Sequence, residues 1–217
     1  MKYYDISMRI HEDMPVPGQA ETLKPKVTHY AAVMDHDLPR SRLDIDLRTG
    51  THLIAPILAR PDGDSVDLMS PTCVLTTCRL IDLSTVENEI LEKDLALFGI
   101  QPGEFILIKT RNSMANDSDR DHGIFRYPDD YNEIPLTLEA ARYLVKIGVK
   151  GVGLDALALK TGNERDIIEL LFERGCALLI GLRLKAVSYG SYRLIALPLR
   201  IESAEASPVR ALLLEGV

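Results

Sequence analysis

The sequence predicts an α/β fold in which a mixed sheet packs against two or three helices. Strand signals dominate the first half of the chain, and helix and strand signals alternate in the second half. A chain of 217 residues, with 46% hydrophobic and 26% charged residues, is long enough to bury one substantial core. The sequence contains no linker, internal repeat or low-complexity tract. We therefore expect a single domain that spans residues 1–217.

Three apolar segments of the first half are predicted to be strands. Apolar side chains alternate between Leu43 and Leu47, which is typical of a half-buried strand. The runs 73–83 and 104–110 are longer and more continuously apolar, and they indicate two further strands. The first half should therefore be rich in sheet.

Two helices with recognisable ends are predicted in the second half. Thr137 can cap a helix that runs to about Ile147, where Gly148 supplies a left-handed stop. Asn163 is predicted to cap a second helix that runs to about Arg174. These helices alternate with strands in βαβαβ order. Strands are expected at 151–155, 176–180, 192–199 and 209–215, with a turn at Pro208.

The segment 112–133 differs from its surroundings because it is polar, rich in Asp and without hydrophobic periodicity. Loops of this length inside a domain are usually either functional lids or disordered inserts. We therefore predict a long loop here and leave both alternatives open.

Charge and cysteine content limit the classes of partner. The formal net charge of -7 disfavours nucleic acid and anionic membranes, because either would usually require a basic face. The first residues lack the apolar run of a secretion signal, and no segment approaches the ~20 apolar residues of a membrane span. We therefore expect a cytoplasmic protein, in which Cys73, Cys78 and Cys176 are reduced and buried in the core.

The segment Arg48-Thr-Gly-Thr-His52-Leu-Ile54-Ala-Pro-Ile-Leu58 resembles H-x-G-T-H-x-D-x-P-x-H, the signature of the cyclase family that includes bacterial kynurenine formamidase. Other blocks are also similar to that family: Tyr4-Asp5-Ile6-Ser7 with Met14-Pro15-Val16, Gly151-Val-Gly-Leu-Asp155, and the closing segments 192–199 and 207–211. The resemblance extends over nearly the whole chain. It implies the swivelling β/β/α fold of the cyclase family and assembly as a homo-oligomer, a dimer or a tetramer.

The resemblance also implies where metal ligands would lie. In the cyclase family this segment, a later helix and the strand after it supply His, Asp and Glu ligands to one or two divalent ions, commonly zinc or manganese. Zinc needs three or four nitrogen, sulfur or oxygen ligands, whereas Ile and Leu have no donor atom and Arg does not deprotonate. We therefore predict no metal cofactor. The family's ligand positions are occupied here by Arg48, Ile54, Leu58, Ile167 and Ile180.

The pattern of replacement is physically coherent. A metal-site carboxylate without its cation would be a buried charge that destabilises the fold, so loss of the metal favours loss of the carboxylates. Ile54 and Ile180 then fill space that would otherwise be a cavity. These residues, with Leu58 and Ile167, are therefore expected to pack in the core.

His52 is the one candidate catalytic residue. It could act as a general base near neutral pH, oriented by Thr51 or Asp155, or it could be a hydrogen-bonded structural residue of the Gly-Thr-His turn. The cations around it could bind a small anionic molecule, or they could be ordinary solvated side chains. The candidate substrate-binding residues are Arg48, Thr51, Asp155, Lys160 and Arg183.

Three functions remain open at this point. The first is a metal-free, non-catalytic homologue that binds a small molecule. The second is a hydrolase or cyclase that acts on a small amide, lactam or ester in the family pocket, with Arg48 polarising the substrate and His52 moving the proton. The third is a partner subunit of an active paralogue.

Overall fold

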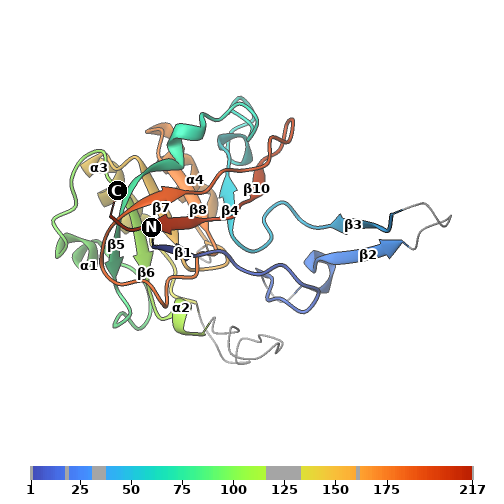
Figure 1. Ribbon diagram of the computed structural model, residues 1–217. Helices are drawn as coiled ribbons and strands as arrows, with labels where there is room; N and C mark the ends of the chain where they lie inside the picture. Colours follow the sequence, from blue (N-terminus) through green and yellow to red (C-terminus); the bar gives the residue numbers. More distant parts are fainter. Residues whose placement is uncertain (1, 18–19, 31–37, 116–132, 160–161, 217) are drawn as a thin grey trace.

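The computed structural model describes residues 2–17, 20–30, 38–115, 133–159 and 162–216, and its framework is one nine-stranded mixed sheet (Figure 1). Parallel strands form its centre and antiparallel strands its two flanks, so the predicted α/β class with a mixed sheet is confirmed. In spatial order the strands are β1 (Tyr3–Asp5), β11 (Leu212–Leu214), β9 (Gly190–Ile195), β5 (Leu75–Asp82), β6 (Phe105–Lys109), β7 (Gly151–Leu154), β8 (Ala177–Ile180), β4 (His52–Ile54) and β10 (Ala206–Pro208).

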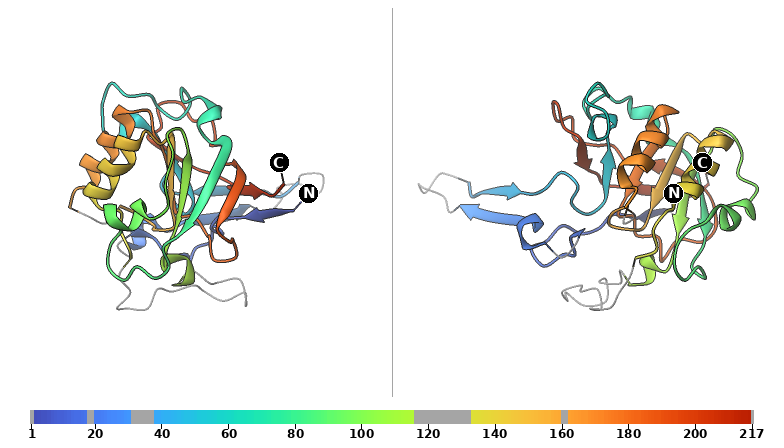
Figure 2. Two further views of the ribbon diagram at one scale, coloured as in Figure 1. Left: turned by 90° about the vertical axis from the view of Figure 1, so that its left-hand side faces the viewer. Right: turned by 180° about the vertical axis from the view of Figure 1, so that it is seen from behind.

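Helices cover one face of the parallel centre. The helices α3 (Leu138–Ile147) and α4 (Glu164–Glu173) lie side by side on that face, with the short helix α1 (Glu92–Ala96) next to α3 (Figure 2). Alternate residues of the central strands face opposite sides of the sheet. Ile106 and Ile108 join the apolar cluster beneath the helices, whereas Phe105 and Leu107 join the cluster on the other face. Along the chain, α3 lies between β6 and β7, and α4 lies between β7 and β8. The expected βαβαβ order is therefore confirmed.

The predicted capping interactions are present at both ends of α3 but not at the start of α4. The Thr137 hydroxyl accepts a hydrogen bond from the backbone N–H of Ala140, and Gly148 adopts a left-handed φ of 87°, as predicted. The helix α4 also begins where expected, directly after Asn163. The Asn163 side chain makes no capping hydrogen bond, however, so its predicted role as a cap was wrong.

The strands β2 (Lys26–Tyr30) and β3 (Arg40–Asp44) form a separate antiparallel ribbon that projects from the body of the molecule (Figures 1 and 2). The predicted half-buried strand from Leu43 to Leu47 was therefore wrong, because β3 ends at Asp44 and Leu43 is 50% exposed. Alternation of apolar residues indicates a strand, but it does not specify what covers the strand.

The closing strands also differ from expectation in one detail. Pro208 was predicted to form a turn, but it is the last residue of β10 and pairs with His52 of β4. A proline is tolerated there because β10 lies at the edge of the sheet, where one side of the strand needs no partner.

The cysteines are free thiols, as expected, but they are not equally buried. Cys78 and Cys176 lie in the core, and burial raises the pKa of each thiol to about 12. Cys73 is only partly buried, because it lies in a turn of 3-10 helix (Pro71–Cys73) before β5 and not within that strand. The expectation of three core thiols was therefore wrong for Cys73.

Two further expectations concern long segments. The predicted loop 112–133 begins as a short helix, α2 (Asn112–Ala115), and residues 116–132 lie outside the described residues. None of the helices in the described ranges is long and apolar enough to cross a membrane.

Candidate functional site

A pocket of about 110 Å³ lies where the base of the ribbon meets the ends of β8 and β4. Its walls come from segments far apart in the sequence: the residues before β2, the loop after β3, the start of β4, the loop after β7, the first turn of α4 and the end of β8. The apolar part of the lining includes Ile54, Leu157, Leu159 and Ile180. The polar part consists of Asp46, Arg48, Thr49, His52 and Glu164.

His52 enters this pocket from the first position of β4, opposite Ile180 of β8. Its side chain is buried, and Nδ1 lies 2.9 Å from the carbonyl oxygen of Gly50. A carbonyl can only accept, so Nδ1 carries the proton and Nε2 is a hydrogen-bond acceptor. Burial, together with the nearby positive charge of Arg48, lowers the pKa of His52 to about 4. His52 is therefore neutral at physiological pH and a weak base.

Arg48 lies at the rim of the pocket and is paired with an acid. Its Nη1 lies 3.5 Å from Oε1 of Glu164, and both side chains are partly exposed. Asp46, whose carboxylate accepts a hydrogen bond from the backbone N–H of Arg48, lines the same pocket. The described lining therefore contains one guanidinium and two carboxylates.

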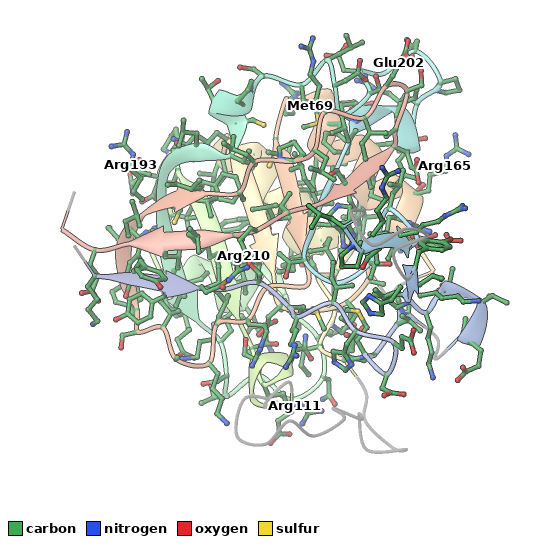
Figure 3. All side chains as sticks on the ribbon, turned by 45° about the vertical axis from the view of Figure 1, so that its right-hand side comes forward. Met69, Arg111, Arg165, Arg193, Glu202 and Arg210 are labelled. Atoms are coloured by element: carbon green, nitrogen blue, oxygen red, sulfur yellow. The ribbon has the colours of Figure 1, made fainter. Side chains whose placement is uncertain are left out.

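Helix α4 is fixed in place near the pocket by its second residue. Arg165 lies at the edge of the molecule (Figure 3), and its Nη2 donates a hydrogen bond to the carbonyl oxygen of Ala59. Its Nε also donates to Glu169 on the next turn of the same helix. The hydrogen bond from Arg165 to Ala59 holds the start of α4, and with it Glu164, against the loop that follows β4.

Thr51 belongs to the framework of the site and not to its lining. Its hydroxyl donates to the carbonyl oxygen of Gly181, 2.5 Å away, and accepts from the backbone N–H of Met8, 2.8 Å away. The chain is so close at this point that a Cβ on Gly181 would lie 2.2 Å from the carbonyl oxygen of Gly50. Gly50 and Thr51 therefore join the N-terminal segment, β4 and the end of β8.

Asp155 forms a separate buried network at the end of β7. Its carboxylate accepts hydrogen bonds from the backbone and the hydroxyl of both Thr110 and Ser113, over distances of 2.7 to 3.0 Å. Burial raises the pKa of Asp155, although these hydrogen bonds act in the opposite direction. The hydroxyl of Ser113 also accepts from the backbone N–H of Leu184. Asp155 thus ties three segments together and does not line the pocket.

The remaining predicted cations do not add to the described lining. Lys160 lies outside the described residues. Arg183 follows β8, where its backbone N–H donates to the carbonyl oxygen of Ile6, and it is not part of the pocket wall. Of the three cations expected to converge, Arg48 is the one that lines the pocket in the described part of the chain.

Of the five positions that would hold metal ligands, Arg48, Ile54 and Ile180 line the pocket with His52, and the side chains of all five offer no donor set. Ile167 lies on the buried face of α4, in the apolar cluster beneath the helices, and Leu58 packs against that cluster. Over the described ranges, no three His, Cys, Asp or Glu side chains are grouped so that they could hold a metal ion. The residues around His52 therefore do not fit a zinc or manganese centre.

Three polar residues of the pocket were not predicted: Asp46, Thr49 and Glu164. Thr49 is buried, and its hydroxyl has no hydrogen-bond partner among the residues that the structure describes. Its place between Arg48 and Gly50 was the only signal available in the sequence. Asp46 and Glu164 gave no signal, because isolated acids are usually solvated surface residues.

The fold and the pocket together define an α/β protein with a small, mostly apolar site at one end of its parallel strands. The sequence model of the Cyclase family matches residues 4–161. This chain therefore belongs to the cyclase family.

Relatives with assigned activities are similar over most of their length. The kynurenine formamidase of Bacillus cytotoxicus is 31% identical over 175 residues, which cover 79% of this chain and 78% of that protein. The kynurenine formamidase of Bacillus thuringiensis is 30% identical over 176 residues, with the same coverage.

Solved structures share the architecture. A potential metal-dependent hydrolase with cyclase activity matches with a TM-score of 0.83 and 34% identity, covering 98% of this chain and 96% of that one. A predicted metal-dependent hydrolase from Bacillus stearothermophilus matches with a TM-score of 0.82 and 34% identity, covering 98% and 97%. Isatin hydrolase A from Labrenzia aggregata, at 22% identity and a TM-score of 0.78, shares the fold over 98% of this chain and 93% of its own.

Proposed function

We propose that this protein is a metal-free member of the cyclase family that binds a small molecule in the pocket beside His52. The observation that carries the proposal is that a pocket of about 110 Å³ is present although Ile54 and Ile180 form part of its wall. If the site had simply closed when its metal-binding residues were replaced, these side chains would fill the space completely. An open apolar pocket with a few polar groups is typical of a small-molecule site.

Elemental analysis of the purified protein tests the metal-free part of this proposal. Cells would be grown with added zinc and manganese, and the metal content would be measured with a chelator-treated sample beside it. We expect less than stoichiometric metal and the same melting temperature with and without the chelator. One zinc or manganese per chain, lost in a His52→Ala variant, would refute the proposal.

The second candidate function is hydrolysis or cyclisation of a small amide, lactam or ester. The acceptor Nε2 of His52 on the pocket wall favours it, as does the similarity to a kynurenine formamidase and to a potential metal-dependent hydrolase with cyclase activity. A pKa of about 4 makes His52 a poor general base at neutral pH, which is why we place this function second. Turnover of N-formylkynurenine that His52→Ala abolishes, and that Glu169→Gln leaves intact, would reverse the order.

We also propose that the chain assembles as a homo-oligomer through the ribbon of β2 and β3. A two-stranded ribbon on its own is only marginally stable in water, because it buries little apolar surface. Leu43 on one face of the ribbon is 50% exposed, and a second copy that covered this face would stabilise it. Light scattering on the purified protein would give the mass of the assembly, and co-purification of a paralogue would indicate a mixed one.

A further inference from the structure

We infer that the pocket beside His52 selects small neutral ring compounds that carry both an N–H donor and a lone-pair acceptor, with pyrazole as the simplest example. This inference rests on the proposed small-molecule function and adds the chemical class of the ligand. It is carried by two polar groups on the pocket wall, by the charges around them and by the size of the space.

The first group is the ring of His52, which requires a donor. Because Nδ1 donates to the carbonyl oxygen of Gly50, the ring is fixed in one tautomer and one orientation. Its other nitrogen, Nε2, is left as an acceptor and has no hydrogen-bond partner within the described part of the chain. An N–H group of a ligand would satisfy it.

The second group is the hydroxyl of Thr49. Thr49 lines the pocket and is only 2% exposed, yet its Oγ1 has no hydrogen-bond partner in the described ranges. A buried polar atom without a partner destabilises a fold, so such atoms usually mark the place of a ligand, ion or water. A lone pair on the ligand would accept the proton of this hydroxyl and remove that cost.

The charges on the wall favour a neutral ligand over an anion. Arg48 already lies 3.5 Å from Glu164, and Asp46 lines the same pocket, so carboxylates outnumber the guanidinium among the described lining residues. A carboxylate ligand would have to displace Glu164 from Arg48 and would lie close to Asp46. Both changes are unfavourable electrostatically.

The size of the pocket limits the ligand to about one small ring. A dry cavity of ~150 Å³ in another protein accommodates benzene, and the pocket here has a volume of about 110 Å³. Ile54, Leu157 and Ile180 supply apolar walls on which the faces of a five-membered ring can pack. A ring with two adjacent nitrogens presents its donor and its acceptor on one edge and leaves the remaining edge apolar.

The test compares three five-membered rings of nearly equal size, and one larger ring that carries a carboxylate, on the full-length protein labelled with ¹⁵N. Pyrazole has the donor and the acceptor, isoxazole lacks the N–H, pyrrole lacks the acceptor, and pyrazole carboxylate adds a negative charge. Binding would be followed by backbone shifts of the residues around the pocket and by the ¹⁵N shift of His52 Nε2. We expect pyrazole to bind about 5- to 10-fold more tightly than isoxazole, as one satisfied hydrogen bond would give. The Nε2 signal should move with pyrazole and pyrrole, but not with isoxazole.

Two variants assign the contacts. In His52→Phe the preference for pyrazole over isoxazole should disappear, and in Thr49→Val pyrazole should lose its advantage over pyrrole. Thr49→Val removes a hydroxyl that has no partner in the described chain, so the variant should fold. Thr77→Val, on the exposed part of β5, is the matched control and should bind all four probes as the wild type does. The shift of Nε2 in the wild type keeps the inference testable even if His52→Phe does not fold.

Each contrary outcome has a distinct meaning. Equal binding of pyrazole and isoxazole would overturn this ligand class while leaving the proposed small-molecule function in place. Tighter binding of the carboxylate, lost in an Arg48→Ala variant, would overturn it in favour of an anion. If none of the four probes shifted any residue of the pocket, the proposed small-molecule function itself would fail.

Discussion

The hydroxyl of Thr51 donates a hydrogen bond to the carbonyl oxygen of Gly181 and thereby joins the start of β4 to the residue that follows β8. The same hydroxyl accepts from the backbone N–H of Met8, so one side chain satisfies backbone groups of two distant segments. This arrangement gives Thr51 a structural role that does not depend on the residues at the other ligand positions. Thr51 holds the framework behind the pocket, and His52 forms part of its wall.

The first prediction concerns the stability that Thr51 provides. Thr51→Val keeps the shape of the side chain but leaves the N–H of Met8 and the carbonyl of Gly181 without a partner. We expect the free energy of unfolding to fall by about 1–3 kcal/mol. Urea denaturation would measure it, with Thr77→Val on the exposed part of β5 as a control that changes stability by less than ~0.5 kcal/mol. An equal effect of the two substitutions would contradict the prediction.

The second prediction concerns the close approach at Gly181. This residue has a φ of 74°, and an added Cβ would lie 2.2 Å from the carbonyl oxygen of Gly50. Gly181→Ala should therefore destabilise the fold by ~3 kcal/mol or more, through the clash added to the backbone strain. Gly99→Ala is the matched control, because Gly99 has a φ of 53° but no atom within 4 Å of the added Cβ. The free energy of unfolding of Gly99→Ala should fall by only roughly 1–2 kcal/mol. Equal losses in Gly181→Ala and Gly99→Ala would show that the clash is absent.

The third prediction concerns the pH dependence of stability through His52. The pKa is about 4 in the folded protein against an ordinary value of 6.5, so between these values the unfolded chain binds more protons than the folded one. The contribution is fully present above pH 6.5 and is lost as the pH falls toward 4. We expect stability to drop by about 2 kcal/mol between about pH 7 and about pH 5 from this group. Urea denaturation at both pH values should show a smaller drop in His52→Gln, and an unchanged drop would contradict the prediction.

The fourth prediction concerns the pairing of Arg48 with Glu164. Both side chains are more than two-fifths exposed, so their interaction should contribute less than ~1 kcal/mol to stability. Glu164→Gln should therefore leave the melting temperature nearly unchanged and increase the affinity of the pocket for a carboxylate probe, because Arg48 is released. Calorimetric titration with acetate would measure the affinity. Glu169→Gln, on the same helix but paired with Arg165, should not increase it, and a gain equal in both variants would refute a specific role for Glu164.

The fifth prediction concerns the ribbon. Leu43→Lys places a charge on a side chain that is already half exposed, so a single chain should keep its stability. If the ribbon is covered by a second copy, the charge should weaken that contact, and light scattering should show a smaller mass. Leu97→Lys is the control, because Leu97 is 85% exposed and lies just beyond α1. A wild-type monomer, or the same loss of mass in both variants, would contradict the prediction.

The parts of the fold that depend on local chemistry were predictable from the sequence. The ends of α3 follow from Thr137 and Gly148, whose hydroxyl and left-handed backbone act within a few residues. The exposure of Leu43 and the strand pairing of Pro208 were not predictable, because both depend on which distant segments lie beside them. A periodic pattern reports on one segment only, whereas burial depends on the neighbours that the tertiary fold provides.

The candidate site was predictable to a similar degree. Its location beside His52, with Ile54 and Ile180 on the wall, followed from the resemblance. The partnership of Arg48 with Glu164 did not, since the two residues are separated by more than a hundred positions and meet only in the folded chain. Asp155 was a candidate substrate-binding residue, but its carboxylate is enclosed by hydroxyl and amide donors from Thr110, which follows β6, and from Ser113 in α2. Such a network can be recognised only when the hydrogen bonds are visible.

The ribbon has a consequence for ligand binding, because residues on both sides of it in the sequence line the pocket. Val16, Pro17 and Leu23 precede β2, and Asp46 and Arg48 follow β3. If a second copy covers the ribbon as proposed, it also positions a wall of the pocket. Self-association and ligand binding then share a coupling free energy that is equal in both directions. In that case a ligand that orders this wall would strengthen self-association, and the apparent affinity for the ligand would rise with protein concentration.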